Sequence, residues 1–326
     1  MAEQVDSTSM ASAMPSLGIS QDSSLVRRLL ELIRFSHTIF ALPFAALACV
    51  FALTHPVQPT DITTRTIVWR LLGVLICMVS ARSAAMALNR LADARIDAAN
   101  PRTANRHIPA GLLTVRQVQA FFVVSSAVFI SACLLFLPNW LPLVFSVPVL
   151  LWLCGYSYAK RFTSAAHLWL GVALALSPAC AWVAIRGEVV LQSPVDLLPA
   201  WGLAVAITCW VTGFDIIYAC QDADFDRGAG LKSIPARLGI AGALRTAAAL
   251  HAVMLVVLAL LPSFFPQLSL GWLYALALVV VGGLVVWQHW LVRPDDLRRV
   301  NLAFFQVNAT ISFGLCLAAA IDAWLR

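Results

Sequence analysis

The sequence predicts an all-α membrane protein, a bundle of about nine transmembrane helices with two aspartate-rich loops on its cytoplasmic side. The 326 residues are 61% hydrophobic and only 12% charged, with a mean hydropathy of +0.85, values that water-soluble domains do not carry. Apolar runs of about 20 residues, the length at which a helix crosses a hydrocarbon core, recur along the chain. These runs lack the alternation typical of membrane β-strands, so we expect helices in a lipid bilayer.

The elements follow from the polar breaks between the apolar runs. Residues 1–24 are rich in serine and lack an apolar run, so we predict a disordered tail before one membrane domain at 25–326. The nine predicted spans are 35–54, 67–89, 114–137, 140–158, 166–185, 197–220, 242–262, 270–291 and 300–322. The third and fourth spans must form a hairpin, because only two residues separate them.

Basic residues predict the orientation, because lysine and arginine gather on cytoplasmic loops. Most of the 22 basic residues lie in alternate polar segments, beginning with the N-terminus. The N-terminus and the long polar segments 90–113 and 221–241 are therefore expected in the cytoplasm, and the chain in the cytoplasmic (inner) membrane. The net charge of +6 then reports topology and a local anion site, and it argues against a nucleic-acid partner.

Acidic residues concentrate in these two long polar segments, at helical spacing. The residues in question are Asn89, Asp93 and Asp97 after the second span, and Tyr218, Asp222 and Asp226 after the sixth. Positions i, i+4 and i+8 share one face of a helix, so each set forms a stripe if its span continues as helix.

Each stripe is unfavourable without a bound cation. Like charges at i, i+4 repel, and acids at a helix C-terminus oppose the helix dipole. Clustered carboxylates with substrate phosphate oxygens suit Mg²⁺, so two facing stripes predict a metal and diphosphate site. The alternative is a solvated loop whose acids pair with nearby arginines, and two matched clusters favour the metal site.

Basic residues for a diphosphate lie beside the acids. Arg102 and Arg106 belong to the first loop and Lys232 to the second, while Lys160 and Arg161 end the fourth span on the same face. Arginine and lysine donors beside metal ions are the expected way to bind and ionise a diphosphate. Lys160 and Arg161 are equally explained as anchors of the cytoplasmic side.

Four further residues are candidates for contact with a substrate. Asp215 lies inside an apolar span, where a carboxylate is costly, and either acts on a polar substrate group or bonds a neighbouring helix. We favour Tyr218 for the site, whereas Tyr156 also fits an aromatic belt at the membrane interface. His37, at the start of the first span, is either interfacial or directed at substrate.

Two motifs resemble those of the UbiA superfamily of intramembrane prenyltransferases. The first is N-x-x-x-D-x-x-x-D at 89–97, followed by RTANR-x-x-P at 102–109. The second is D-x-x-Y-A-x-x-D-x-D-x-D at 215–226, followed by GxKS at 230–233. The resemblance covers about residues 28–322 and implies an all-helical bundle with a cavity that opens laterally for an isoprenoid tail. Similar enzymes transfer a polyprenyl group from its diphosphate to an aromatic ring.

The resemblance also implies a role for each candidate residue. Ligands of Mg²⁺ would be Asn89, Asp93, Asp97, Asp222 and Asp226. The diphosphate of the polyprenyl substrate would be neutralised by Arg102, Arg106, Lys160 and Lys232. Asp215, Tyr218 and Arg161 would be catalytic, and Tyr156 and His37 would face the aromatic hydroxy acid acceptor.

Arg90 departs from the pattern of 4-hydroxybenzoate enzymes, which commonly have aspartate at this position. The segment FSHTIFALPFA at 35–45 and the pair NR at 89–90 look like the subgroup associated with menaquinone made through the futalosine route. A 4-hydroxybenzoate type of acceptor in quinone biosynthesis is therefore the general expectation, and a dihydroxynaphthoate is the alternative.

Two other classes compete with a prenyltransferase. A secondary transporter predicts carboxylates near the bilayer midplane, whereas these lie at helix ends beside long loops. A CDP-alcohol phosphotransferase also uses clustered aspartates and Mg²⁺, but its D-G-x-x-A-R motif is absent from the sequence.

Overall fold

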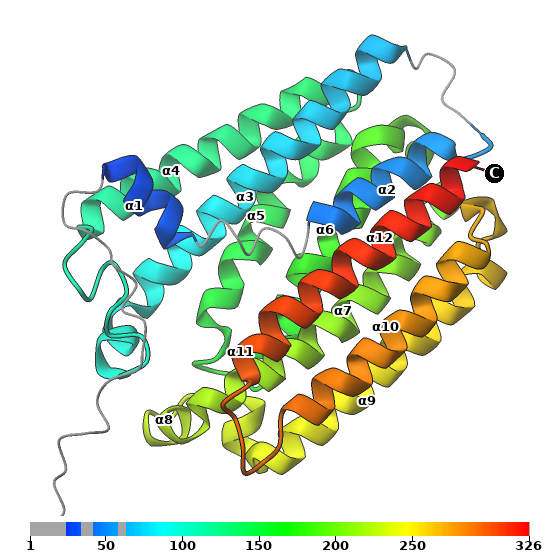
Figure 1. The fold of residues 1–326 in the computed structure, drawn as a ribbon. Coiled ribbons are helices and arrows are strands. Elements are labelled where there is room, and N and C mark those ends of the chain that lie inside the picture. The colour runs from blue at the N-terminus through cyan, green and yellow to red at the C-terminus, as the bar shows by residue number, and fades with distance from the viewer. Residues whose placement is uncertain (1–23, 34–41, 58–62, 326) are drawn as a thin grey trace, which may run out of the picture.

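A computed structural model describes residues 24–33, 42–57 and 63–325, and these form a bundle of long helices (Figure 1). Within those ranges the structure has no strand, and its one isolated bridge joins Arg293 and Asp296. The predicted tail lies outside the described residues except for Ser24, which caps the first short helix, α1 (Leu25–Leu32). The all-α prediction is confirmed.

Eight helices of the described part are long and apolar enough to cross a membrane. The main helices are α2 (Leu42–Thr54), α3 (Thr64–Ala99), α4 (Val115–Ala132), α5 (Leu141–Ala159), α6 (Ala166–Gln192), α7 (Leu198–Ala219), α9 (Ile234–Phe264), α10 (Trp272–Leu291) and α12 (Asn308–Leu325). Helix α2 has 13 residues and occupies the end of the first predicted span, whose first part lies outside the described residues. The count of about nine therefore agrees with the structure.

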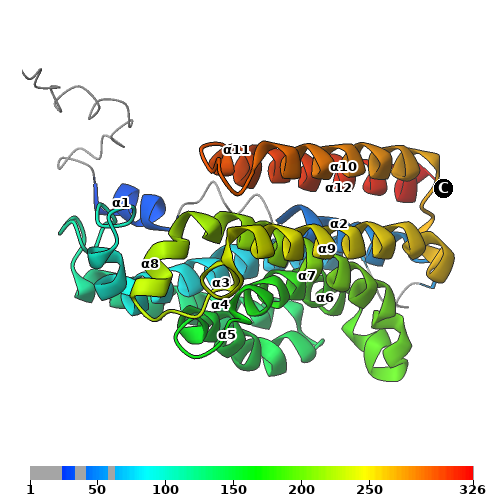
Figure 2. The same cartoon turned by 90° about the horizontal axis from the view of Figure 1, so that it is seen from below.

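Both aspartate-rich segments lie at the same end of the bundle. Helix α3 continues to Ala99, ten residues beyond the predicted span, so the first polar stripe is helical. The loop after α3 and the short helix α8 (Ala223–Gly228) lie at one end of the bundle, and the C-terminus at the other (Figures 1 and 2). Helices α10 and α12 lie on the opposite side of the molecule from α3, α4 and α5 (Figure 2).

A buried ion pair supports the end of the bundle remote from the aspartates. Arg186 is 0% exposed and interrupts α6 with non-helical backbone angles. Its guanidinium donates to both carboxylate oxygens of Asp196, at 3.0 and 2.7 Å, and to the Val57 carbonyl at 2.6 Å. Asn139 donates to the Val183 carbonyl at 2.8 Å. These side chains satisfy polar groups at the kink, which explains why α6 extends past the predicted residue 185.

Removing Arg186 should destabilise the protein strongly. Arg186→Met leaves Asp196, whose side chain is 7% exposed, as a buried unpaired charge. Such losses cost about 3–5 kcal/mol, so the thermal unfolding midpoint in detergent should fall by about 5 °C or more. Arg298→Met is the matched control, because that arginine also pairs with an aspartate but is 88% exposed. Equal midpoints for the two variants would contradict the structural role of Arg186.

Candidate active site

The first polar stripe lies along about the last three turns of α3. Asp93 and Asp97 are 2% and 4% exposed, and Asn89 donates to Asp93 Oδ2 at 3.3 Å. The continuous helix turns all three side chains to one face, as their spacing predicts. Carboxylates this buried need cationic partners, and the structure supplies one for each.

The end of α5 provides the partners of Asp93. Lys160 Nζ donates to Asp93 Oδ2 at 2.8 Å, and Arg161 Nη2 lies 3.5 Å from Asp93 Oδ1. The Arg161 guanidinium also donates to the Ala92 carbonyl. Asp93 Oδ1 is buried and accepts no hydrogen bond, so it retains capacity for a further ligand.

The loop after α3 connects the two acidic segments. Arg106 Nη1 donates to both oxygens of Asp97, at 2.7 and 2.8 Å. Arg102 Nε donates to Asp222 Oδ1 at 2.8 Å, and its Nη2 donates to the other oxygen. Asn100 adds a third donor to Asp222 at 3.0 Å. The loop therefore binds the second segment directly. Burial opposes the charge of Arg102, but its bonds to Asp222 outweigh burial and raise its pKa.

The predicted stripe of Tyr218, Asp222 and Asp226 on one continuous helix is wrong. Helix α7 ends at Ala219, the tighter 3₁₀ turn Cys220–Asp222 follows, and α8 then begins. A 3₁₀ turn has about three residues per turn, so the helical register is lost between Tyr218 and Asp226. Asp222 is instead oriented by its bonds to Arg102 and Asn100.

Tyr218 belongs to the same cluster as Asp222. Arg102 Nη1 donates to the Tyr218 hydroxyl at 3.0 Å, and the guanidinium carbon lies 5.2 Å from the ring centroid. This contact fixes the direction of the Arg102 side chain. Tyr218 therefore lies beside Asp222, at the aspartate end of the candidate site.

The remaining residues of the second segment lie in different environments. Asp226 interacts with the Ser233 side chain and with the charge of Lys160. Lys232 is exposed, and its ammonium donates to the Phe162 carbonyl at 3.1 Å. Its side chain is thus bound to the loop after α5, and its diphosphate contact stays a prediction. Asp224 is 96% exposed and pairs with Arg227.

Asp215 forms a partly buried pair with His167, a residue that was not among the candidates from the sequence. His167 Nδ1 lies 2.7 Å from Asp215 Oδ2, and His167 Nε2 accepts the Ile234 backbone N–H at 3.3 Å. Since Nε2 accepts, the imidazole is neutral and donates from Nδ1. The pair orients the Asp215 carboxylate from α7. A histidine within the apolar run of α6 was the signal that could have identified it.

An apolar cavity of about 380 Å³ lies between α3, α4, α5 and α6. Val74, Met78, Arg82 and Met86 line it at four-residue spacing along α3. Twelve residues of helix measure about 18 Å, so the cavity extends from near the aspartates far into the bundle. Tyr156 lines it from α5. His37, the other residue expected to face the acceptor, lies outside the described residues.

Arg82 is the cationic side chain in the lining of this cavity. Its Nε is buried and has no hydrogen-bond partner, and an arginine in apolar surroundings is costly without an anion. Arg82 was not among the candidates from the sequence, although an arginine within a membrane span is itself a functional signal.

Arg90 lies outside the cavity lining. It is 6% exposed, and its Nε lies 3.5 Å from the Leu32 carbonyl at the end of α1. Arg28 of α1 in turn donates to the Leu112 carbonyl of the loop after α3, at 3.1 Å. Arg90 therefore joins α1 to α3, while Arg28 joins α1 to the loop that carries Arg102 and Arg106.

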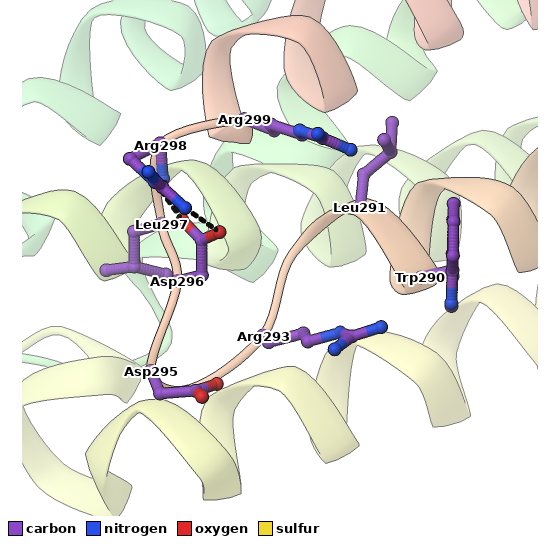
Figure 3. A pocket seen from close by; sticks show the side chains of 8 residues that line it. All are labelled: Trp290, Leu291, Arg293, Asp295, Asp296, Leu297, Arg298 and Arg299. Carbon is purple, nitrogen blue, oxygen red and sulfur yellow. Dashed lines mark hydrogen bonds and ion pairs between the residues drawn. The ribbon is translucent and has the colours of Figure 1, made fainter.

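A second pocket lies in the loop between α10 and α12, away from these residues. It has a volume of about 580 Å³, and the predicted site residues do not line it. Figure 3 shows Arg298 paired with Asp296, while the nearby Arg293 and Arg299 carry exposed side chains. We interpret this hollow as a solvent-facing feature of a polar loop.

The aspartate cluster fits Mg²⁺ in its chemistry. Its donors are carboxylate oxygens, and Asp93 Oδ1 is a buried oxygen without a hydrogen-bond partner. Among the described residues, no three His, Cys, Asp or Glu side chains lie close enough to hold one ion. Mg²⁺ commonly binds one or two carboxylates together with water and substrate phosphates, so Asp93 and Asp97 on one side and Asp222 and Asp226 on the other suit it.

Comparisons with known proteins relate the chain to one family. The model of the UbiA prenyltransferase family matches residues 41–311. The 4-hydroxybenzoate octaprenyltransferase of Saccharophagus degradans is 31% identical over 241 residues, which cover 74% of this chain and 76% of the relative. That of Nitrosomonas europaea is 33% identical over 231 residues, which cover 70% and 73%.

Solved structures share the fold. The apo structure of a UbiA homolog from Aeropyrum pernix K1 matches with a TM-score of 0.71 at 28% identity, over 89% of this chain and 97% of the other. A UbiA homolog from Archaeoglobus fulgidus bound to DMAPP and Mg²⁺ matches with a TM-score of 0.63 at 15% identity, over 90% and 99%.

Metal and diphosphate should stabilise the protein through Asp222. Mg²⁺ with inorganic diphosphate should raise the thermal unfolding midpoint, because a ligand that binds only the folded state stabilises it. Asp222→Asn should remove most of this shift, whereas the exposed Asp224→Asn should retain it. A full shift in Asp222→Asn, measured by differential scanning fluorimetry, would contradict the assignment.

Proposed function

The chain belongs to the UbiA prenyltransferase family, and on this premise we propose that it transfers a polyprenyl group to an aromatic hydroxy acid. The donor is a polyprenyl diphosphate, the acceptor is of the 4-hydroxybenzoate type, and Mg²⁺ is the cofactor. The membrane-spanning bundle and the family support a prenyltransferase, and the product would serve quinone biosynthesis. One observation carries the proposal. Arg106 binds Asp97 of the first acidic segment and Arg102 binds Asp222 of the second, beside an apolar cavity.

The three cationic side chains beside the aspartates are suited to ionise the donor. Arg102, Arg106 and Lys160 now neutralise Asp222, Asp97 and Asp93. When a diphosphate enters, these cations can donate to its oxygens while the carboxylates bind metal. Mg²⁺ would offset negative charge on the departing diphosphate. The side chains thus hold the leaving group at one place and favour cleavage of its bond to the allylic carbon.

The apolar cavity would hold the isoprenoid tail and keep water from the allylic cation. Its lining along α3 is about 18 Å long, and burial of hydrocarbon is favourable by about 0.8 kcal/mol for each CH₂. Water in this region would capture the cation and release a prenyl alcohol instead of the product.

Arg82 supports an acceptor that carries a carboxylate. Its buried Nε has no partner in the protein, and a carboxylate can accept two parallel bonds from one guanidinium. The acceptor ring would then lie near Tyr156, which lines the same cavity. Asp215, oriented by His167, would accept the proton that the ring loses after attack on the allylic carbon.

The alternatives receive less support. The dihydroxynaphthoate alternative is based on the pair NR at 89–90 and on the segment 35–45. The contact of Arg90 with the Leu32 carbonyl does not favour either acceptor, and residues 35–41 lie outside the described residues, so the measurement below includes both acceptors. A secondary transporter would place its acids near the midplane, but the buried acids Asp93 and Asp97 lie on the last turns of α3. We further propose that the aspartate end faces the cytoplasm, as the basic loops predict.

Loss of either acidic segment should abolish turnover. Asp93→Ala and Asp222→Ala should each lower the rate of diphosphate release and prenylated product by about a hundredfold or more. The measurement uses purified protein in membranes with a polyprenyl diphosphate, Mg²⁺, and either 4-hydroxybenzoate or dihydroxynaphthoate. Asp295→Ala, in the exposed loop after α10, should retain activity. Near-normal turnover in a folded Asp93→Ala or Asp222→Ala protein would refute the two-segment site.

Replacement of Arg82 should affect the acceptor alone. Arg82→Met removes the guanidinium but keeps much of its apolar volume, so the KM for 4-hydroxybenzoate should rise about tenfold or more. The KM for the polyprenyl diphosphate should stay within about twofold. Arg116→Met, on the exposed first turn of α4, is the control. An unchanged acceptor KM in Arg82→Met would exclude the carboxylate contact.

A further inference from the structure

The last long helical segment contains a π-helical bulge. Ala303–Val307 forms a five-residue π-helix between the short helix α11 (Val300–Leu302) and α12. A π-turn inserts one residue into the helix and leaves carbonyls without their usual partners, so it persists only where other groups stabilise it. Such bulges frequently occur at functional sites.

Asn308 and Gln288 stabilise the bulge. Both are 0% exposed. Asn308 Nδ2 donates to the Phe304 carbonyl at 2.8 Å and the Ala303 carbonyl at 3.3 Å, and Gln288 Nε2 donates to Ala303 at 2.9 Å. Asn308 Oδ1 accepts from Trp210 Nε1 at 3.0 Å and from Gln288 at 3.2 Å. Asn308 therefore connects the bulge to Trp210 of α7 and to Gln288 of α10.

The bulge places Phe304 against Tyr218. The two ring centroids are 4.3 Å apart with an interplanar angle of 35°, and Phe304 meets Phe214 edge-on at 5.4 Å. Tyr218 in turn accepts from Arg102, which binds Asp222. A continuous series of contacts thus joins Asn308, deep in the bundle, to the cations that meet the diphosphate.

The register of the bulge decides this contact. An α-helix turns by about 100° per residue, so loss of the extra residue would rotate Phe304 by about that angle relative to α12. Phe304 would then leave the Tyr218 ring. Tyr218 would lose the packing that opposes rotation of its ring, and Arg102 would lose a fixed partner.

We propose that Asn308 and Phe304 are positioning residues, which hold Tyr218 and through it Arg102 in the orientation that receives the polyprenyl diphosphate. The inference rests on the proposed prenyl transfer, and it extends the site to the last helix, which carries none of the aspartate motif. Both residues act through Tyr218 and Arg102 and do not touch the substrate. Their replacement should therefore weaken binding of the polyprenyl diphosphate and leave binding of the acceptor unchanged, because the proposed acceptor site is at Arg82 and Tyr156.

Steady-state kinetics of four variants test the proposal. Phe304→Leu removes the ring, Phe304→Tyr keeps it, and Asn308→Leu removes the hydrogen bonds at similar volume. Gln306→Leu changes an exposed polar side chain of the same bulge and is the matched control. Rates are measured against polyprenyl diphosphate and 4-hydroxybenzoate separately, together with the thermal unfolding midpoint of each protein.

Phe304→Leu and Asn308→Leu should raise the KM for the polyprenyl diphosphate by about fivefold, because each removes the packing of the Phe304 ring on Tyr218 and so frees the Arg102 guanidinium. The KM for the acceptor should stay unchanged in both. Phe304→Tyr and Gln306→Leu should resemble the wild type in both constants.

An equal rise of both KM values, or no rise in a folded Phe304→Leu protein, would overturn the proposal. If Asn308→Leu does not fold, Phe304→Leu and Phe304→Tyr decide the matter. If the wild-type protein forms no product from any phenolic acid, the proposed function is refuted. If the wild type is active and Phe304→Leu has the same KM for the polyprenyl diphosphate, only this inference is refuted.

Discussion

Charge neutralisation of buried carboxylates is the interaction on which the arrangement of the site depends. Asp93 and Asp97 are almost fully buried at the end of α3, where neither the helix dipole nor water compensates their charge. Lys160 from the end of α5 and Arg106 from the loop after α3 supply the compensation. Because the same loop carries Arg102 to Asp222, this neutralisation also joins the two acidic segments, which are distant in the sequence.

The ion pairs that stabilise the free protein are also suited to exchange. In the proposed reaction, a metal ion would replace the cations at the carboxylates, and a diphosphate would replace the carboxylates at the cations. The number of charge contacts is then preserved during binding, so no charge is left buried and unpaired. Arg102 is the member best placed to change partners, because Tyr218 holds its direction independently of Asp222.

The polar groups are separated by an apolar interior, which suits a reaction that water would divert. At one end are the aspartates, and at the other Arg186 and Asp196 support the kink of α6. Between them lies the cavity, whose lining is mostly apolar and includes Arg82. An apolar chain would contact the hydrocarbon lining, and an anionic group would contact Arg82. The buried amides of Asn308 and Gln288 show a third use of polarity, which is to stabilise a helix register that α-helical hydrogen bonding alone would not maintain.

The all-helical membrane fold, the approximate spans and the i, i+4, i+8 stripe on α3 could be predicted from the sequence, because hydropathy and helical periodicity are local properties of the chain. The sequence also indicated that Arg102 and Arg106 accompany the acids. Three features became visible in the folded chain: a 3₁₀ turn interrupts the second stripe, His167 pairs with Asp215, and Arg82 lines a cavity. These features depend on which helices are neighbours and on where hydrogen bonds leave the α-helical pattern, and neither is encoded in the spacing of residues along one helix.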